Sequence, residues 1–369
     1  MRVLICPDKW KGSLTAGEAA AAIERGIRRA WPQAETRLLP LADGGEGSMD
    51  LLGTAWKLKP RRLRVTGPLR RPVTARYYLG DGKAVIESAA ACGLQLVPPP
   101  RRHPDRTTTV GVGSLIEDAL ARGATEIYVL LGGSATNDCG AGMAAALGYR
   151  FYTADGKDIV PMASSLAAVQ RIDAYGLVPS LRSARLTVLC DVTNPLLGPT
   201  GATYTYAGQK GASPEDLPRL ETAMRHFADC VERDLGVSVT GLVAGGAAGG
   251  LGAGAHAFLG ARLVPGTEVI FPAIGFPAAA AAADLIITGE GSIDEQTLQG
   301  KVVAAVAAAG RPTVAVCGRS LLSTRDSPFT ALLSLEEHTP LPLPVRMAEA
   351  ATLLENMVAD YALAHPCGG

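Results

Sequence analysis

Four loops in this sequence combine glycine with carboxylate, hydroxyl or amide side chains, and each directly follows an apolar stretch that predicts a β-strand. The loops comprise residues 42–47, 132–138, 190–195 and 289–294. Carboxylates are the ligands that Mg²⁺ prefers, while backbone N–H groups and small hydroxyls beside glycines bind the oxygens of anions. A phosphoryl-transfer site must hold a metal, an acceptor hydroxyl and phosphate oxygens. Together, the four loops therefore favour phosphoryl transfer to a small molecule.

Taken one at a time, each loop is more typical of a turn or a helix N-cap than of a ligand site, because Asp, Asn, Ser and Gly are the usual residues there. The standard phosphate-binding motif is absent, because Gly300-Lys301 is followed by valine and Glu295 stands where that motif has its first glycine. Residues 250–255 loosely match a dinucleotide-binding fingerprint, which a segment so rich in glycine gives by chance. The functional prediction therefore depends on the combination of loops.

The two ends of the chain follow the strand–helix–strand pattern of a parallel sheet. The four predicted strands are residues 2–6, 36–41, 284–288 and 313–317. A capping box at Thr15 and Glu18 starts the helix between the first two strands, and residues 296–309 predict the helix between the last two. Loops at the carboxyl ends of such strands meet at one edge of the sheet, where open α/β sheets bind their ligands.

The middle of the chain has a mixed pattern. Alternating apolar residues on both sides of a Gly-Asp-Gly turn at 80–82 predict a hairpin. Apolar stretches predict strands at 127–131 and 186–190, and a helical pattern covers 214–235. We therefore predict an α/β protein with two domains. These are a parallel, Rossmann-like domain formed by residues 1–62 and 266–369, and an inserted mixed α+β domain formed by residues 63–265.

The composition argues against several classes of function. The 369 residues include 35 basic and 35 acidic side chains, and this zero net charge gives no general attraction to nucleic acid or to an anionic membrane. The seven cysteines are scattered, which favours free thiols in a reducing cytoplasm. Residues 235–261 lack charge, but their many glycines predict a loop and a small-residue helix rather than a membrane span. The N-terminus shows no signal-peptide pattern, so we expect a cytoplasmic protein.

Seven motifs follow one another along the chain. They are I-C-P-D-K-W-K-G-S-L at 5–14, A-D-G-G-E-G at 42–47, G-G-S-A-T-N-D at 132–138, C-D-V-T-N-P-L at 190–196, Q-K-G-A at 209–212, G-A-A-G-G at 246–250 and I-T-G-E-G-S-I-D at 287–294. In these motifs the chain resembles the bacterial glycerate kinase family that lacks a Walker motif. The resemblance extends over essentially the whole length, and so many motifs in one order make it highly specific.

The resemblance implies transfer of the terminal phosphoryl group of ATP, with Mg²⁺, to glycerate in a cleft between two domains. The residues that it carries over as the catalytic core are Asp8, Lys11, Asp43, Asp191 and Asp294. We interpret Asp191 as the group that accepts or orients the substrate hydroxyl proton, and Lys11 and Lys210 as charges on phosphate or carboxylate. The metal candidates are Asp43, Glu290 and Asp294. The candidates for binding substrate or phosphate oxygens are Gly132, Gly133, Ser134, Asn137, Asn194 and Lys210.

Two departures from the family pattern affect these expectations. Ser292 stands where the family usually has arginine, which removes a cation able to form bidentate contacts. If that arginine contacts phosphate in relatives, another cation must replace it here, or activity is reduced. Cys139 replaces a glycine, and a glycine at that position suits a positive φ angle, so the loop before it could be shifted.

The resemblance favours D-glycerate as substrate and 2-phosphoglycerate as product. The alternatives are a kinase that makes 3-phosphoglycerate or acts on another small hydroxy-acid, and a non-catalytic sensor of sugar acids or nucleotides. The retained carboxylates argue against the sensor, because an anionic ligand binds more easily without them. The partners expected are glycerate and ATP, with no nucleic acid and no membrane, and a homo-oligomer stays open.

Overall fold

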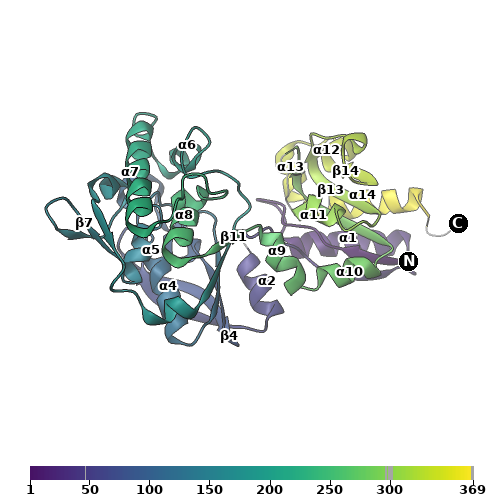
Figure 1. Cartoon of the computed structure of the whole chain (residues 1–369). Helices are drawn as coiled ribbons and strands as arrows, with labels where there is room; N and C mark the ends of the chain where they lie inside the picture. The colour runs from purple at the N-terminus through teal and green to yellow at the C-terminus, as the bar shows by residue number, and fades with distance from the viewer. Residues whose placement is uncertain (46, 296, 298–301, 367–369) are drawn as a thin grey trace. The chain divides into compact units, whose positions relative to one another are not determined.

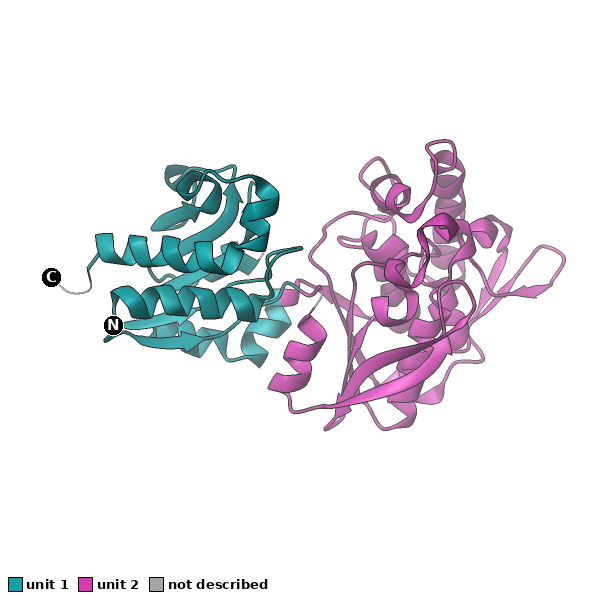
Figure 2. Cartoon of the chain, turned by 180° about the vertical axis from the view of Figure 1, so that it is seen from behind, with its two compact units in different colours: residues 1–43, 267–369 teal, residues 44–266 magenta. Residues whose placement is uncertain are grey.

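The computed structural model describes residues 1–45, 47–295, 297 and 302–366, and these divide into two units (Figure 2). Unit 1 comprises Met1–Asp43 and Thr267–Gly369, and unit 2 comprises Gly44–Gly266. The sequence prediction changed domain at residues 62 and 265, whereas in the structure residues 44–62 belong to unit 2.

Unit 1 is built on a five-stranded parallel sheet with the strand order β14-β13-β12-β1-β2. Its strands are β1 (Arg2–Ile5), β2 (Glu35–Leu38), β12 (Leu285–Ile293), β13 (Thr313–Ser320) and β14 (Ala331–Ser334). The first strand of the chain pairs with β12 on one side and β2 on the other. The sheet therefore requires both ends of the chain, as the sequence predicts.

Helices cover both faces of this sheet (Figure 1). They are α1 (Ala16–Ala30), α9 (Gly266–Ala273), α10 (Phe276–Ala282), α11 (Val302–Ala307), α12 (Leu335–His338), α13 (Leu343–Ala348) and α14 (Ala350–Ala364), with a 3₁₀ turn at Thr324–Asp326. Val3 and Ile5 of β1 pack in one core cluster with α1 and α14, while Leu4 and Cys6 pack in another with α10 and α11. Successive side chains of a strand point to opposite faces, so an unbroken apolar strand suits a sheet covered on both sides.

Unit 2 contains a six-stranded mixed sheet, ordered β11-β10-β6-β5-β4-β3, and a three-stranded sheet, ordered β8-β7-β9. The strands are β3 (Lys59–Thr66), β4 (Pro72–Gly80), β5 (Lys83–Glu87), β6 (Glu126–Leu130), β7 (Arg150–Tyr152), β8 (Asp158–Ile159), β9 (Arg171–Asp173), β10 (Arg185–Leu189) and β11 (Arg262–Val264). β4 and β5 form the hairpin predicted around residues 80–82. From β5 to β11 the neighbouring strands of the larger sheet are parallel.

The helices of unit 2 pack with its sheets around one large apolar core. They are α2 (Ser48–Ala55), α3 (Ala89–Cys92), α4 (Val110–Ala121), α5 (Ala141–Ala146), α6 (Ala202–Tyr206), α7 (Leu217–Leu235) and α8 (Ala247–Leu259). Short 3₁₀ turns lie at Leu94–Leu96, Pro99–Arg101, Pro104–Arg106, Ala163–Ala168, Pro179–Ser183 and Gly208–Lys210. The rings of Phe151 in β7, Phe227 in α7 and Phe258 in α8 pack together, with centroids 5.9 to 6.2 Å apart.

One predicted loop is wrong. Residues 289–294 were expected to follow a strand ending at 288, but β12 continues to Ile293. The reason is pairing with β13, in which Glu290 lies opposite Cys317 and Ser292 lies opposite Arg319. Of the helix predicted at 296–309, the described residues show α11 at Val302–Ala307, and residues 308–309 form the turn after it. Gln296 and residues 298–301 of that prediction lie outside the described residues, as do Glu46 and Cys367.

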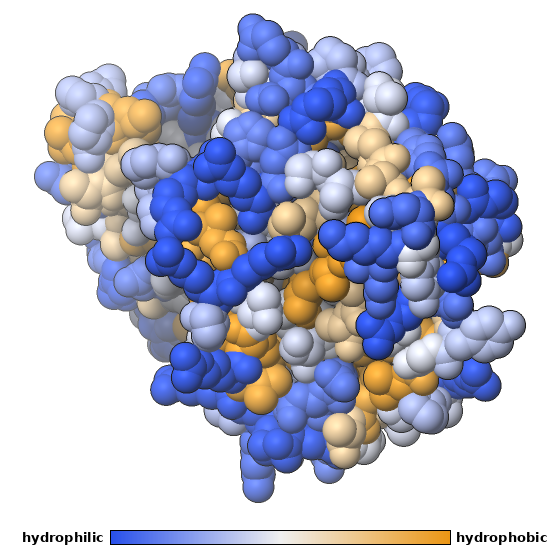
Figure 3. Space-filling model, turned by 90° about the vertical axis from the view of Figure 1, so that its left-hand side faces the viewer, coloured by the Kyte–Doolittle hydropathy of each residue, from blue (hydrophilic) through white to orange (hydrophobic). Residues whose placement is uncertain are grey.

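The uncharged segment 235–261 forms a loop and the small-residue helix α8, as predicted. Within the described part of the chain, every helix is too short or too polar to span a membrane. Figure 3 shows one face of the molecule, where hydrophilic residues predominate and hydrophobic residues form small separate groups. The described residues on that face therefore present no broad apolar surface.

Candidate active-site residues

The predicted site residues fall into two groups, one in each unit. Those in unit 1 are Asp8, Lys11, Asp43, Glu290 and Asp294. Those in unit 2 are Gly132, Gly133, Ser134, Asn137, Asp191, Asn194 and Lys210. Most of these residues lie on loops that follow strands, but Glu290 lies within β12 and Lys210 ends the 3₁₀ turn Gly208–Lys210.

In unit 1, a pocket of about 430 Å³ brings all five predicted residues of that unit together. The loop after β1 is attached to β12 by hydrogen bonds, since the Asp8 N–H donates to the carbonyl of Gly289 at 2.8 Å and the Thr288 hydroxyl donates to Cys6. The Asp294 carboxylate accepts the N–H of Thr297 at 3.0 Å, which fixes the turn after β12. Long-range pairing of β1 with β12 thus collects carboxylates that are far apart in the sequence.

The electrostatics of this pocket favour a cation. Burial, and then the nearby Asp43 carboxylate, raise the pKa of Asp8 to about 7; Glu290 adds to the rise, whereas Lys9 opposes it. The Lys9 N–H donates to Asp8 at 2.6 Å, and its ammonium lies 3.4 Å from an Asp43 oxygen. Burial is the main cause of this rise, and the nearby Asp43 and Glu290 carboxylates add negative charge that a divalent cation with oxygen ligands would offset. Carboxylate oxygens are the kind of ligand that Mg²⁺ takes, although among the described residues no three of these carboxylates bring their oxygens within 4.8 Å of one another.

Lys9 is a residue that the sequence analysis missed. Its default interpretation is a solvated surface charge, but the structure places it in the same pocket as Asp8 and Asp43. The sequence feature that could have indicated this is its position directly after Asp8, because neighbours of a carboxylate at a strand end lie near the same pocket. Lys11, which was predicted, is exposed and lines the same pocket.

In unit 2, the glycine-rich loop 132–138 connects β6 to the segment before α5. Asp138 fixes the end of this loop. Its buried carboxylate accepts hydrogen bonds from the Thr109 N–H at 2.8 Å and from the Thr109 hydroxyl at 2.9 Å. Gly249 approaches so closely that a Cβ added there would lie 1.9 Å from the carbonyl oxygen of Thr136. The loop is thus held by packing and hydrogen bonds rather than left free.

Three buried polar atoms of this loop lack a hydrogen-bond partner among the described residues. They are the Ser134 hydroxyl, the Thr136 hydroxyl and the Asn137 carbonyl oxygen. The Asn137 amide nitrogen donates to Thr203 at 3.3 Å, which orients the side chain. A buried polar atom without a partner costs stability, so such atoms in a glycine-rich loop point to a bound ligand.

Lys210 occupies an unusual position for a lysine. Its side chain is only 2% exposed, and its ammonium donates to the Thr136 carbonyl at 2.7 Å. Burial lowers its pKa to about 8, while Cys92 and Asp138 act in the opposite direction. The Lys210 ammonium therefore holds the loop backbone between Ser134 and Asn137, and it also lies 6.0 Å from the ring centroid of Tyr206 in α6.

Asp191 and Asn194 follow β10. The Asp191 side chain is exposed, and one of its oxygens accepts the Gly266 N–H at 3.1 Å. Its other oxygen would lie 3.1 Å from a Cβ at position 44, which explains a glycine there. Asn194 donates to the Thr200 carbonyl at 2.7 Å and accepts from the Tyr206 hydroxyl at 2.6 Å. Asn194 thus braces its own loop, and Asp191 remains accessible.

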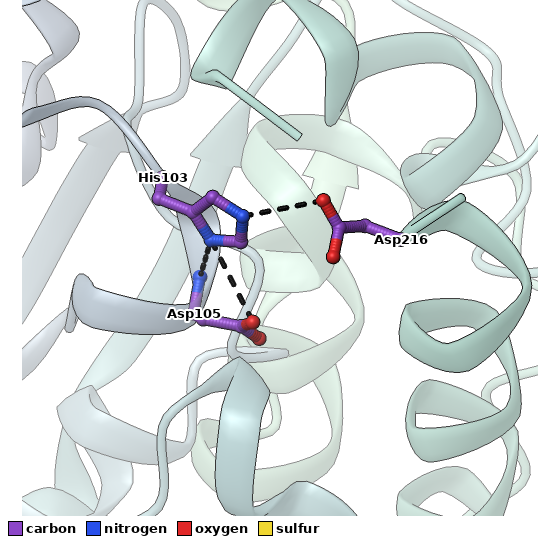
Figure 4. Close-up of side chains that lie close together, drawn as sticks. All are labelled: His103, Asp105 and Asp216. Carbon is purple, nitrogen blue, oxygen red and sulfur yellow. Dashed lines mark hydrogen bonds and ion pairs between the residues drawn. The ribbon is translucent and has the colours of Figure 1, made fainter. Parts of the chain in front are cut away.

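A third cluster lies elsewhere in unit 2 (Figure 4). Among the described residues, only the side chains of His103, Asp105 and Asp216 bring three potential metal-ligand atoms within 4.8 Å of one another. The Asp105 N–H donates to Nδ1 of His103, so Nε2 carries the hydrogen that faces Asp216 at 3.3 Å. Arg219 pairs with both carboxylates and supplies the positive charge that a metal would bring. We interpret this cluster as an ion-pair network that attaches residues 103–106 to the start of α7.

Comparison with known proteins is consistent with these observations. The model of the glycerate kinase family matches residues 3–364. The chain belongs to the glycerate kinase family. It is 43% identical to the glycerate kinase of Bacillus subtilis (strain 168) over 371 residues, which cover 98% of this chain and 97% of that one. It is 44% identical to the glycerate 2-kinase of Escherichia coli (strain K12) over 324 residues, 86% of this chain and 85% of that one.

A crystal structure named as glycerate kinase 2 from Salmonella typhimurium LT2 matches with a TM-score of 0.84 at 42% identity. The match covers 99% of this chain and 98% of that chain. It confirms the α/β fold class predicted from the sequence.

Two departures from the family pattern now have a structural context. Cys139 adopts a φ of +52°, so it occupies the left-handed conformation that a glycine would take more easily. Ser292 of β12 lies opposite Arg319 of β13, and both line the unit 1 pocket. Arg319 on the neighbouring strand therefore places a guanidinium beside position 292, where the family usually has an arginine.

Proposed function

We propose that this protein is an ATP-dependent glycerate kinase that converts D-glycerate to 2-phosphoglycerate. The observation that carries the proposal is the carboxylate pocket of unit 1, which is lined by five predicted residues, among them the buried carboxyl of Asp8 with its raised pKa. Family membership supplies the substrate class, and the 44% identity to a glycerate 2-kinase supports the 2-hydroxyl as acceptor.

In the proposed reaction, the 2-hydroxyl oxygen of glycerate bonds to the γ-phosphorus of ATP, and the bond from that phosphorus to the β–γ bridging oxygen breaks to release ADP. Asp191 accepts the hydroxyl proton, for which its exposed carboxylate is suited. The glycine-rich loop binds anionic oxygens through the Ser134 hydroxyl and backbone N–H groups, the Asn137 carbonyl oxygen accepts from a substrate hydroxyl, and Lys210 keeps that loop in place. Asp43, Glu290 and Asp294, together with Asp8, would hold Mg²⁺, which neutralises phosphate charge when bound.

We further propose that the protein works in the cytoplasm. The six described cysteines, Cys6, Cys92, Cys139, Cys190, Cys230 and Cys317, are buried free thiols. Free thiols of this kind persist in a reducing compartment.

The direct test is to incubate the protein with ATP, Mg²⁺ and D-glycerate and to identify the product by phosphorus NMR. We expect 2-phosphoglycerate. Formation of 3-phosphoglycerate would keep the kinase and overturn the acceptor hydroxyl, whereas no phosphorylated product would overturn the activity on glycerate.

Mg²⁺ should stabilise the protein more at high pH than at low pH. The folded pKa of Asp8, about 7, exceeds the usual pKa of an aspartate, so the folded state binds more protons between about pH 4 and pH 7. Without metal, the Asp8 carboxyl therefore lowers the free energy of unfolding as pH rises through that range. Once ionised, the carboxylate attracts Mg²⁺. We expect a larger increase in Tm with Mg²⁺ at about pH 8 than at about pH 5.5.

The Asp8→Asn variant should lose most of this pH dependence. Asp284→Asn is the matched control in the same unit. The Asp284 carboxylate pairs with Arg2 on the surface and does not line the pocket. An equal pH dependence of the Mg²⁺ effect in wild type and Asp8→Asn would contradict the assignment of Asp8 to the metal-binding group.

Arg319 should supply the cation that Ser292 lacks. We expect Arg319→Ala to raise KM for ATP about tenfold, the effect of losing one charged hydrogen bond. Adding Ser292→Arg to that variant should restore most of the loss, because the two positions are opposite each other on paired strands. Arg325→Ala, an exposed arginine of the same unit, is the control and should change KM little. A double variant no better than Arg319→Ala would argue against exchange between the two positions.

A further inference from the structure

The unit 1 pocket has a second part that the proposed catalytic residues leave unused. Besides carboxylates and lysines, it is lined by apolar side chains and by Arg319 and Arg346. The apolar lining residues are Trp10, Leu335, Leu343, Met347 and Ala350. One cavity therefore combines a group of charged residues suited to a metal-bound anion with an apolar wall.

The apolar wall is partly open to solvent. Leu343 is 60% exposed and Met347 is 37% exposed, and their neighbours Leu341 and Val345 are also among the exposed large apolar residues. Four such side chains in seven consecutive positions around α13 make this an exposed apolar strip. Apolar surface gathered beside a polar cavity is typical of a ligand-binding groove.

Two buried donors in this wall lack acceptors. Among the described residues, neither the indole N–H of Trp10 nor Nε of Arg346 has a hydrogen-bond acceptor. Arg346 is only 9% exposed; it donates through Nη2 to Glu336 at 2.7 Å and through Nη1 to the Gly318 carbonyl at 3.4 Å. These contacts fix the guanidinium in the wall of the pocket. A partner that brings acceptor atoms would satisfy the remaining donors.

We propose that this wall binds the base and ribose of the phosphoryl donor, an adenine nucleotide, and that the same pocket receives its polyphosphate. The inference rests on the proposed kinase function and adds where the nucleotide binds. The purine packs on Leu343 and Met347, and its nitrogens or the ribose oxygens accept from the fixed cation and the indole. The polyphosphate extends to Lys11 and the metal-binding carboxylates.

The size and chemistry of the pocket favour a nucleotide over glycerate. Glycerate has three carbons and no apolar part, so it would leave both the apolar wall and most of the 430 Å³ without contacts. A nucleotide has a flat apolar base at one end and a metal-binding anion at the other, matching the two kinds of lining residue. Leu343 and Met347 thus contribute apolar contact, and the charged residues contribute contacts with phosphate.

The test is the affinity for Mg-ADP, measured by isothermal titration calorimetry without glycerate. A glutamate in the strip should repel the nucleotide and disrupt its packing, so we expect Leu343→Glu to raise Kd at least about tenfold. Leu363→Glu is the matched control, because Leu363 is 61% exposed on α14 of the same unit and does not line this pocket. It should change Kd less than about twofold.

A second variant separates the cation from the apolar strip. Arg346→Met keeps the length and apolar packing of the side chain but removes its donors, and we expect it to weaken Mg-ADP binding about tenfold. Circular dichroism and Tm establish that each variant folds. Equal Kd values for Leu343→Glu and Leu363→Glu, or no Mg-ADP binding by the wild type, would overturn the inference.

These experiments distinguish a failure of the proposed nucleotide site from a failure of the proposed function. If the wild type phosphorylates glycerate but Leu343→Glu binds Mg-ADP normally, the kinase stands and the nucleotide site is wrong. If the wild type does not phosphorylate glycerate but shows the expected pattern of Kd values, the nucleotide site stands and the proposed acceptor is wrong.

Discussion

Replacing Asp191 with asparagine should lower kcat about a thousandfold and leave the Kd for Mg-ADP nearly unchanged. Asparagine has almost the same shape and can still accept the Gly266 N–H, so the loop after β10 should keep its conformation. It cannot take up a proton from the substrate hydroxyl at neutral pH. Steady-state kinetics with D-glycerate and calorimetry with Mg-ADP measure the two quantities.

Asp173→Asn is a suitable control for this prediction. Asp173 also belongs to unit 2 and also accepts a backbone N–H, that of Tyr175 at 2.9 Å, but lies on the small sheet with β7 and β8. Its replacement should leave kcat within about twofold of wild type. A kcat for Asp191→Asn within a few-fold of wild type would end the role of Asp191 as proton acceptor.

Replacing Lys210 with methionine should lower kcat about a hundredfold, because the Thr136 carbonyl loses its buried donor and the glycine-rich loop loses its support. Lys210 acts here as a positioning residue, so Mg-ADP binding should change much less than kcat. Lys157→Met, a change at an exposed lysine in the turn between β7 and β8, is the matched control and should have little effect.

The same variant makes a prediction about pH. The folded pKa of Lys210, about 8, lies below the usual lysine value, so between about pH 8 and pH 10.5 the unfolded state binds more protons than the folded state. From about pH 8 upward, the free energy of unfolding of wild-type unit 2 therefore rises relative to that of Lys210→Met. The rise is about 2 kcal/mol at pH 9.5. Below about pH 8 the difference between the two proteins should be constant.

Urea unfolding at about pH 7 and pH 9.5 measures this difference. Trp56 belongs to unit 2 and its ring lies 4.7 Å from that of Tyr128, so its fluorescence reports the unfolding of that unit once Trp10 and Trp31 are replaced by phenylalanine in both proteins. A wild-type advantage that stays the same at both pH values would show that the buried amine does not titrate as described.

The sequence identified the family and named five of the residues that line the unit 1 pocket, because its signals are local. A carboxylate directly after an apolar stretch, as in Asp8 and Asp43, indicates a strand end whatever the rest of the chain does. The parallel arrangement of both chain ends and the hairpin at 80–82 follow equally from short patterns, and both are confirmed.

The features that were missed depend on contacts between distant segments. Gly289 and Gly291 predict a loop locally, but pairing with β13 keeps them in a strand. A lysine is usually exposed, but Lys210 is buried. Its burial follows from the packing of Gly208–Lys210 against the glycine-rich loop. Arg319 belongs to no motif, since only the strand register brings it level with Ser292. No single segment carries this information.

The pairing of β1 with β12 has a consequence for synthesis on the ribosome. Arg2–Ile5 emerges first, yet its partner Leu285–Ile293 and the helix α14 that packs on α1 are translated after the whole of unit 2. Unit 2 is a continuous stretch and can fold as soon as Gly266 has left the exit tunnel. Until then, the apolar faces of β1 and α1 have no native cover. We therefore expect nascent chains to depend on chaperones that shield the N-terminal segment, and truncation before α14 to leave that segment prone to aggregation.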